Sequence, residues 1–482
     1  MRKFVIFLLL LAVLMLVAAC GPNDGDENST TPAGSNTDNG TETQPLWANL
    51  PDIKLSGYEF RIFEATPSSV TGIDTPQGDV ATMTGDIIND AIYNRNRQVE
   101  ERFDVAISTQ QFESSSAVAK VIQNSVSSGD DVCALALTDP ARMVTLSLSG
   151  YLYNLWDIEY LDLTQPWYSQ QQVNDFTIYD KLYLLMGDFA YSTYLFGAAL
   201  VYNVDLADEL SLPDLYEIVK TNQWTLDKMY EVTENVPDDL NGDGKFVEDD
   251  DRFAFAIRNT NNLMNFQYCS GLSIVKFNKA TNNYELDFNA EKMQTVLEKV
   301  NALFAKNRTI VAENYIDLFN SGRLLMRTTY IGGLFEHHSM NDNFRPIPYP
   351  KFDTQQEKYL SMMTASVLVM GMPKSVQDTS SAGLILEAMS EKSYGELKEG
   401  VYEQVLSYQT MRDEKSLEML RLIGDGLIID FGYLTDTGSI VRYIIGDCVA
   451  SGSTSVASYY ASKEKSLKTF YDRLFDTYSK LS

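Results

Sequence analysis

The sequence predicts an α/β fold in which mainly parallel sheets are covered by helices. Residues 58–63 have the pattern of a strand, residues 86–103 place apolar side chains at helical spacing, and 105–107 continue as a second strand. A helix near 116–127 and a buried strand at 132–137 repeat the alternation. Strand–helix–strand order of this kind is typical of parallel sheets with helical covers.

Length and charge narrow the possibilities further. The chain has 482 residues, of which 44% are hydrophobic, so it is too long for one small module and two lobes are expected. Its 66 acidic and 38 basic residues give a formal charge of −28. A surface of this sign repels phosphate backbones, which excludes nucleic acid as a partner. With only two histidines, a His-rich zinc site is also excluded.

The N-terminus has the pattern of an export signal. Arg2 and Lys3 precede an apolar run over 4–19, which is short for a spanning helix of about 20 residues. The run ends in Val-Ala-Ala-Cys20, which resembles the bacterial lipobox. The resemblance implies that residues 1–19 are a lipoprotein signal peptide and that Cys20 carries the lipid. The alternative is an uncleaved N-terminal anchor, which also leaves the chain outside the cell.

Residues 20–46 are predicted to be a flexible linker behind the lipid anchor. From Gly21 to about Gln44 the segment is polar and holds no aromatic residue, so it cannot bury enough surface to fold. We therefore expect the folded part to begin near Trp47, on the extracytoplasmic face of the cell membrane.

The remaining cysteines and the later segments predict ordinary core structure. Cys133, Cys269 and Cys448 are odd in number and have apolar or small neighbours, which predicts buried, inert thiols. Residues 253–257 are expected to form a strand. An apolar stripe within 290–304 predicts a helix with Asn289 as its N-cap, and the last hundred residues are expected to be largely helical.

A series of short motifs also runs along the chain in a fixed order. They are 90–96 (DAIYNRN) with 99–101 (VEE), 166–168 (PWY), 201–203 (VYN), 224–229 (WTLDKM), 321–323 (SGR), 347–351 (IPYPK), 356–359 (QEKY) and 412–416 (RDEKS). Together they resemble the extracellular solute-binding proteins of family 1, the sugar-transporter type, and within them a clostridial lipoprotein branch. The motifs span nearly all of the mature chain.

The resemblance implies a two-lobed, periplasmic-binding-protein-like α/β fold of type II. Its lobes would be joined by a hinge that the chain crosses more than once, with ligand in the cleft between them. Lobe 1 is predicted to comprise 47–190 with 350–395 returning to it, and lobe 2 to comprise 191–349 with 396–482 returning. The first crossing is expected within Gly187–Leu200 and the second near 349–351, where Pro350 stiffens the connection.

One acidic loop matches the spacing of a calcium site. Gly244 stands at the sharp sixth position of the pattern, and the twelfth position holds Asp where helix–loop–helix sites have Glu. The candidate ligands are Asp239, Asn241, Asp243, Lys245 through its carbonyl, and Asp250. We predict a structural calcium ion in the second lobe. The alternative is a tight Asn-Gly/Asp-Gly turn on an acidic surface.

Candidate ligand contacts combine aromatic and acidic side chains at strand ends and at the expected hinge. Aromatic planes suit the apolar faces of sugar rings, and carboxylates suit their hydroxyls. The candidates are Glu64, Asp139, Trp167, Asp188, Tyr191, Tyr194 and Tyr330. The alternative for each aromatic residue is core packing, and for each carboxylate a turn or helix cap.

These observations favour a lipid-anchored receptor that captures a carbohydrate, expected to be an oligosaccharide, and delivers it to an ABC-type permease. We expect the protein to be a monomer. We also expect no enzymatic activity, because no Gly-x-Ser-x-Gly elbow occurs and the adjacent His337 and His338 are interpreted as a surface pair. The alternatives are a secreted carbohydrate hydrolase with paired carboxylates, and a surface ligand sensor that feeds no transporter.

Overall fold

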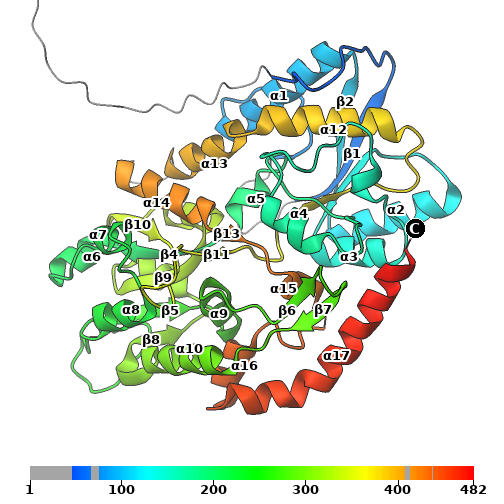
Figure 1. Cartoon of the computed structure of the whole chain (residues 1–482). Helices are drawn as coiled ribbons and strands as arrows, with labels where there is room; N and C mark the ends of the chain where they lie inside the picture. Colours follow the sequence, from blue (N-terminus) through cyan, green and yellow to red (C-terminus); the bar gives the residue numbers. More distant parts are fainter. Residues whose placement is uncertain (1–45, 67–74, 408–412, 437, 482) are drawn as a thin grey trace, which may run out of the picture. The chain divides into compact units, whose positions relative to one another are not determined.

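The computed structural model of the chain describes residues 46–66, 75–407, 413–436 and 438–481 (Figure 1). The predicted signal peptide, Cys20 and nearly all of the linker lie outside the described residues. Leu46–Ser482 form one compact unit. In the part of the chain that is described, no helix is long and apolar enough to cross a membrane.

The first lobe is built on a four-stranded sheet of order β12-β3-β1-β2. Its strands are β1 (Glu59–Ala65), β2 (Ala106–Phe112), β3 (Leu135–Thr138) and β12 (Val369–Gly371). β1 pairs in parallel with both β2 and β3, whereas β12 is antiparallel to β3. Helix α1 (Ile87–Phe103) links β1 to β2 and buries the apolar side chains that predicted it. The expected strand–helix–strand unit is confirmed.

The second lobe is built on a five-stranded sheet of order β10-β4-β9-β5-β8. Its strands are β4 (Ala198–Asn203), β5 (Phe253–Ile257), β8 (Thr309–Val311), β9 (Leu324–Tyr330) and β10 (Phe344–Ile347). β5 is parallel to β8 and β9, and β4 is antiparallel to β9 and β10. The predicted strand 253–257 is confirmed as β5, which is fully buried between β9 and β8.

Helices cover both sheets and make up most of the C-terminal part, as predicted. Asn289 caps α10 by accepting a hydrogen bond from the Lys292 N–H at 3.0 Å. The helices are α2 (Ser115–Ser128), α3 (Pro140–Leu148), α4 (Gln170–Phe176), α5 (Ser192–Leu195), α6 (Val204–Glu209), α7 (Leu215–Lys220), α8 (Leu226–Thr233), α9 (Met264–Cys269), α10 (Ala290–Leu303), α11 (Tyr315–Asn320), α12 (Thr379–Ser393), α13 (Glu396–Ser407), α14 (Glu414–Asp425), α15 (Phe431–Thr435), α16 (Ile444–Ser451) and α17 (Val456–Lys480). Two short ladders complete the fold, β6 (Val275–Asn278) with β7 (Asn283–Leu286), and β11 (Ser361–Met362) with β13 (Leu427–Ile428).

Backbone hydrogen bonds between connecting segments form the hinge. The Thr364 N–H donates to the Phe196 carbonyl at 3.2 Å, and the Ser361 N–H donates to the Gly426 carbonyl at 2.7 Å. Three segments therefore lie side by side: the residues just before β4, the segment around β11, and β13. The segment 349–351 is instead held within the second lobe, because Lys351 exchanges backbone hydrogen bonds with Trp224 and Leu226. The second crossing therefore lies further along the chain, at 361–368.

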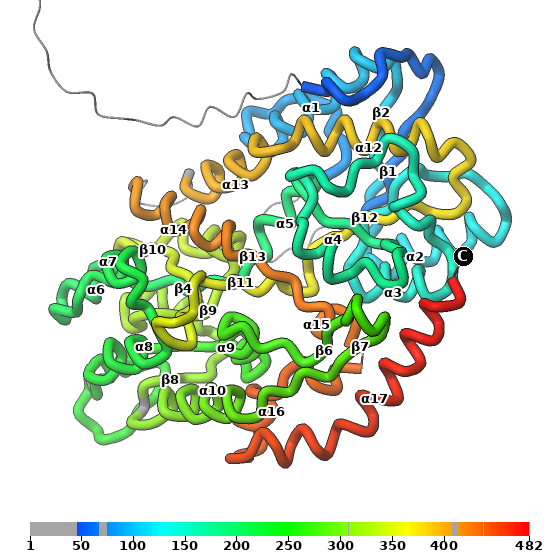
Figure 2. Tube along the Cα trace, in the orientation of Figure 1, coloured from blue at the N-terminus to red at the C-terminus, as the bar shows by residue number. Residues whose placement is uncertain are grey.

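The C-terminal segment contacts both lobes. Helix α13 packs on α1, and α14 packs on β10. Helix α17, red in Figure 2, packs on α10 and α16 and reaches α3 at its end. There the Tyr478 and Ser147 hydroxyls are 3.1 Å apart.

The three cysteines of the folded part are buried and free, as predicted. Burial raises the pKa of each thiol, to about 12 for Cys269. They are therefore protonated and unreactive at neutral pH.

Candidate functional site

A cavity of about 330 Å³ lies where the second sheet meets the hinge. The carboxyl ends of the parallel strands β5 and β9 open into it, and this end of a sheet is where open α/β folds bind ligands. Its wall comprises Phe196, Arg258, Asn259, Asn261, Asn262, Met264, Asn265, Tyr315, Arg327, Thr328, Thr329, Tyr330, Gly333, Glu336, Thr364, Ala365, Ser366, Tyr433 and Tyr443. Both the second lobe and the hinge therefore contribute to the site.

Aromatic rings form much of this wall. Tyr330 ends β9 and Tyr315 begins α11, while Tyr433 and Tyr443 come from the C-terminal part. Burial, together with Tyr315 and Tyr443, raises the pKa of Tyr330 to about 12, so its hydroxyl stays protonated at neutral pH. The Tyr433 hydroxyl accepts a hydrogen bond from the Ala365 N–H of the hinge at 3.3 Å. The rings offer apolar faces and hydroxyl donors together.

Asparagine amides supply the next group of polar contacts. A single 3₁₀ turn, Thr260–Leu263, directly follows β5 and carries several of them. Asn259 caps this turn, and the Asn262 side chain accepts a hydrogen bond from the Asn259 N–H in return. Helix α16 packs against the turn through Gly446, where a Cβ would overlap the Thr260 carbonyl.

Asn265 of α9 is the most buried amide in the wall. Its Nδ2 donates to the Tyr349 hydroxyl at 3.1 Å. Its Oδ1 is buried and has no hydrogen-bond partner among the described residues. A buried acceptor without a donor costs about 1–3 kcal/mol, so this position favours a donor that approaches from the cavity side.

A buried arginine supports the wall from behind. Arg327 of β9 is fully buried, and its Nη2 lies 2.8 Å from Oε2 of Glu336. Its Nε donates to Nε2 of His337 at 3.0 Å, and its guanidinium lies 5.0 Å from the ring centre of Tyr315. Arg327 thus holds two wall residues in place.

His337 is neutral and internal. Burial, with the nearby Arg327 charge, lowers the pKa of His337 well below its usual value. Since Nε2 accepts from Arg327, Nδ1 carries the proton and donates to Asn320 Oδ1 at 2.6 Å. The interpretation of the two histidines as a surface pair was therefore wrong for His337. His337 is buried because the inward-facing Arg327 needs an uncharged acceptor, whereas His338 is exposed.

Of the predicted ligand contacts, Tyr330 lines this cavity. Asp188 and Tyr194 contact each other outside this cavity. The Asp188 carboxylate accepts hydrogen bonds from the Tyr194 hydroxyl and, at 3.1 Å, from the Gly395 N–H. Burial raises the pKa of Asp188 to about 6. Both residues line a smaller cavity of about 200 Å³.

Trp167 and Tyr191 pack inside the first lobe. The Trp167 Nε1 donates to Glu387 at 3.2 Å, and Trp167 lines a third cavity of about 340 Å³ with Glu387 and Glu391. Burial raises the pKa of Glu387 to about 8. Tyr191 is fully buried, and its hydroxyl donates to the Thr75 carbonyl.

Glu64 and Asp139 have structural partners. The buried Glu64 accepts hydrogen bonds from the Gly78 N–H at 2.9 Å and from the Gln111 amide at 3.0 Å, and burial raises its pKa to about 7. Asp139 caps α3 by accepting from the Arg142 N–H at 2.9 Å. Neither lines the cavity at the hinge.

Sequence reasoning missed most of the wall. One signal was available, since Arg258 and the asparagines follow the predicted strand 253–257 and therefore lie at its carboxyl end. Nothing local marks Thr364, Tyr433 or Tyr443, because the hinge ladders bring them to the site.

The acidic loop of the calcium pattern is exposed and internally bonded. Asp239 accepts hydrogen bonds from the N–H groups of Gly242 at 2.8 Å and of Gly244 at 2.7 Å. Asp243 accepts from the Lys245 N–H at 2.8 Å. Among the described residues, no three His, Cys, Asp or Glu side chains are placed to share a metal ion. The loop thus has the required donors and a tight turn, but its carboxylates do not converge.

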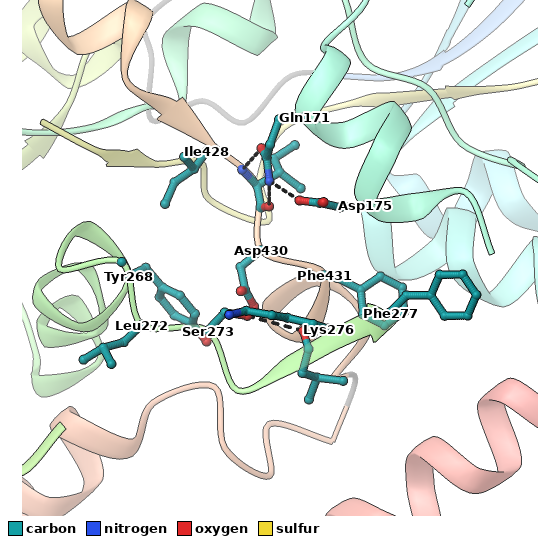
Figure 3. Close-up of a pocket in the computed structure, with 13 residues that line it drawn as sticks. Gln171, Asp175, Tyr268, Leu272, Ser273, Lys276, Phe277, Ile428, Asp430 and Phe431 are labelled. Carbon is teal, nitrogen blue, oxygen red and sulfur yellow. Dashed lines mark hydrogen bonds between the residues drawn. The ribbon is translucent and has the colours of Figure 1, made fainter. Parts of the chain in front are cut away.

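A further cavity of about 300 Å³ is lined by residues of α4, α9, β6, β13 and the start of α15 (Figure 3). Gln171 of α4 binds the backbone of Ile429, donating to its carbonyl at 2.7 Å and accepting from its N–H at 2.9 Å. Asp430 caps α15 there, and burial raises its pKa to about 6. Tyr268 also lines this 300 Å³ cavity, and its ring contacts that of Tyr433 in the hinge cavity, with ring centres 5.6 Å apart. Hence paired tyrosines separate the two cavities.

Comparison with known proteins identifies the fold. No protein family profile matches the sequence, and no curated protein matches it. Among solved structures, the chain is similar to the galacto-N-biose-/lacto-N-biose I-binding protein of the ABC transporter from Bifidobacterium longum, with 10% identity, TM-score 0.56, and coverage of 86% of this chain and 97% of that one. It is also similar to the GacH receptor of Streptomyces glaucescens, which has been solved with acarbose, with 12% identity, TM-score 0.51, and coverage of 86% and 99%.

A third similar structure is UgpB from Mycobacterium tuberculosis in complex with glycerophosphocholine. The identity is 14% and the TM-score 0.52, with coverage of 87% of this chain and 99% of that one. At these identities the likeness concerns the fold alone. It confirms the predicted α/β architecture of two lobes, of the kind seen in solute-binding proteins.

Proposed function

We propose that the chain is a lipid-anchored receptor on the extracytoplasmic face of the membrane, which captures a carbohydrate between its lobes and delivers it to an ABC-type permease. An oligosaccharide is the expected ligand. The observation that carries the proposal is the cavity at the hinge, where tyrosine rings and asparagine amides line one wall.

The chemistry of this wall suits a sugar. The faces of a sugar ring are apolar and pack on aromatic planes, while its hydroxyls exchange hydrogen bonds with amides and phenols. The Asn265 Oδ1 is an acceptor that a ligand hydroxyl can satisfy. Stacking and hydrogen bonds in a cleft that excludes water are sufficient for a micromolar Kd, about −8 kcal/mol.

The charge of the wall supports binding over hydrolysis. Glycosidases generally use two carboxylates that flank the scissile bond. Among the described residues that line the cavity, Glu336 is the one carboxylate, and it is paired with Arg327 at 2.8 Å. A dyad would have to be completed by residues from outside this wall.

Delivery to a permease would use the hinge. The connecting segments that contain Phe196 and Thr364 lie side by side, which would let the two lobes rotate about a common axis. A ligand that contacts both lobes would favour the closed form. The closed form would then be the state that the membrane partner recognises. Lipid on Cys20 and the linker 20–46 would keep the receptor beside that partner.

We also propose a structural calcium ion on the loop from Asp239 to Asp250. The spacing of the donors supports it, as do the internal hydrogen bonds that hold Asp239 and Asp243 on one tight turn. Binding would require these carboxylates to turn inward, because they do not converge in this structure.

Calorimetry on the chain beginning at Gly21 tests the receptor proposal, with a panel of mono- and oligosaccharides and peptides. Tyr330→Ala should weaken sugar binding by a factor of about 2 to 12 through loss of the aromatic contact, which is worth roughly 0.5–1.5 kcal/mol beyond the area it buries. Trp156→Ala is the matched control, because Trp156 is exposed and lies outside the cavity.

Calorimetry, analysis of the recovered sugar and uptake measurements in cells distinguish the alternative functions. Recovery of cleaved sugar would establish a hydrolase. Binding only to peptides would overturn the carbohydrate proposal. Unchanged sugar uptake in cells that lack the chain would leave a sensor that feeds no transporter.

A further inference from the structure

The charged residues that line the hinge cavity have a net positive charge, whereas the chain as a whole is strongly negative. Arg258, Arg327 and Glu336 are the charged members of its wall, so the formal balance is 2 − 1 = +1. The whole chain carries −28. The cavity beside Trp167, in contrast, is lined by Asp162, Glu387 and Glu391. A positive wall in so acidic a protein indicates a ligand that carries negative charge.

Arg327 cannot supply that recognition. It is fully buried, and its charge is matched by Glu336 at 2.8 Å. Its remaining N–H groups donate to His337, Thr328 and Gly333. Arg258 is therefore the basic group of the wall that is open to a ligand.

Arg258 follows directly on β5, at the carboxyl end of the strand, and its side chain is 58% exposed. Only its Nε is engaged within the described chain, by Glu313 at 3.0 Å. Glu313 is 77% exposed and does not line the cavity. Exposed ion pairs of this kind contribute about 0–1 kcal/mol, so Glu313 competes weakly with a ligand.

The free part of the guanidinium has the geometry for an anion. Its two Nη atoms carry four N–H donors in one plane, which match the two oxygens of a carboxylate or the oxygens of a phosphate or sulfate. Tyr315 and Tyr330 line the same wall as Arg258. An anionic group bound at Arg258 would thus place its sugar ring beside these tyrosines.

We infer that the ligand is an acidic sugar, whose negatively charged group is held by the Nη atoms of Arg258 while its ring packs on Tyr315 and Tyr330. This inference rests on the proposed function and specifies its substrate class. The common chemistry is an oxyanion on a pyranose, and a uronic acid, a sugar phosphate or a sugar sulfate would each provide it.

Matched pairs of ligands test the inference by calorimetry on the chain beginning at Gly21. The pairs are glucuronate with glucose, galacturonate with galactose, and digalacturonate with galactobiose. Glucose 6-phosphate and glucose 6-sulfate distinguish the source of the oxyanion, and inorganic phosphate tests the anion without a sugar. We expect the acidic member of at least one pair to bind about 10- to 100-fold more tightly than its neutral partner, which is the range for a hydrogen bond to a charged group.

Two variants should shift this preference in opposite directions. Arg258→Gln should remove the 10- to 100-fold preference of the acidic sugar over its neutral partner. Glu313→Ala, which frees the Nε and removes a competing charge, should strengthen acid binding by up to about fivefold. Arg252→Gln is the matched control, because Arg252 pairs with Glu209 and Asp238 at the other end of β5.

The remaining outcomes overturn the inference in distinguishable ways. If neutral sugars bind as tightly as acidic ones, the ligand class is wrong and the carbohydrate receptor stands. If inorganic phosphate binds as tightly as every acidic sugar, the sugar plays no part and both proposals fail. If no sugar of either class binds, both fail as well. A preference for acids that survives in Arg258→Gln assigns the recognition to another residue and overturns the role of Arg258.

Discussion

The Nε of Arg327 donates to the Nε2 of His337 at 3.0 Å, in a site where both side chains are fully buried. This pair lies directly behind the cavity wall, because Arg327 also holds Glu336 and lies over the ring of Tyr315. The uncharged imidazole is thus the acceptor that allows a cationic side chain to be buried at the site.

Replacement of His337 should damage both stability and binding. His337→Ala leaves the Arg327 Nε unpaired and removes ring contacts with Phe319 and Phe344, at a cost of about 2–4 kcal/mol in the free energy of unfolding. His338→Ala, the adjacent exposed control, should change it by less than about 0.5 kcal/mol. Denaturant unfolding measures both, and equal losses would contradict the buried role of His337.

The same histidine should make the protein sensitive to acid. The folded-state pKa of His337 is well below its usual value of 6.5, so below that pH the unfolded chain binds a proton that the native chain does not. Stability is present in full above about pH 6.5 and should fall by about 1.4 kcal/mol per pH unit as the pH drops below it. The difference in stability between wild type and His337→Ala should accordingly shrink as the pH falls from 7 to 5.

Glu387 should have the opposite pH dependence. Its folded-state pKa is about 8 against 4.5 for the free side chain, because burial beside Trp167 disfavours the carboxylate. The native state holds a proton that the unfolded state releases, so this contribution is present below about pH 4.5 and is lost as the pH rises toward 8.

Glu387→Gln keeps the side chain neutral and should therefore flatten this dependence. Relative to wild type, the variant should gain about 1.4 kcal/mol or less per pH unit between pH 5 and 8. Glu403→Gln, on the exposed face of α13, should follow the wild-type curve. Urea unfolding at several pH values measures the differences, and parallel curves for Glu387→Gln and wild type would contradict the buried, protonated state.

Gly446 should control the position of the asparagine turn. A Cβ at this position would overlap the Thr260 carbonyl, so Gly446→Ala must displace the turn that carries Asn259 and Asn262. We expect a loss of about 1–3 kcal/mol in stability and weaker ligand binding. Gly400→Ala is the control, because its Cβ would meet only the Cγ2 methyl of Ile87, at 3.3 Å. Unchanged affinity in Gly446→Ala would show that the turn does not position ligand contacts.

Calcium should stabilise the fold if the loop from Asp239 to Asp250 binds it. At a hundredfold excess of calcium over its Kd, the free energy of unfolding should rise by about 2.7 kcal/mol, and a chelator should reverse the rise. Asp243→Ala should abolish the effect, whereas Asp249→Ala, which lies outside the predicted ligand set, should preserve it. Thermal unfolding provides the measurement, and no shift with calcium would leave the loop as a tight turn.

Much of the local structure was predictable because it depends on neighbouring residues. Thr225 caps α8, because its hydroxyl accepts a hydrogen bond from the Lys228 N–H at 3.2 Å. Asn289 caps α10 in the same way. The apolar spacing that predicted α1 corresponds to the side chains that α1 buries.

The candidate site was predictable only in part, and Tyr330 illustrates why it was found. It lies at the end of a strand, and strand ends can be located from the sequence. Glu64 was chosen as a strand end and Asp188 as part of the expected hinge, yet their carboxylates accept hydrogen bonds from Gly78 and Tyr194. A single sequence does not distinguish a carboxylate that faces a cleft from one that accepts hydrogen bonds from its own loop.

The sequence by itself determined the α/β class, the alternation of strands and helices in the first lobe, and the expectation of an exported, tethered protein. These follow from apolar periodicity, caps and composition, which act over a few residues. The tertiary structure decided which residues share the site. Arg258, Tyr330 and Tyr433 meet because β5 and β9 are neighbours in one sheet and because the pairing of β11 with β13 returns the C-terminal part to the hinge. Such pairing depends on packing between segments far apart in the chain, so no local pattern reveals it.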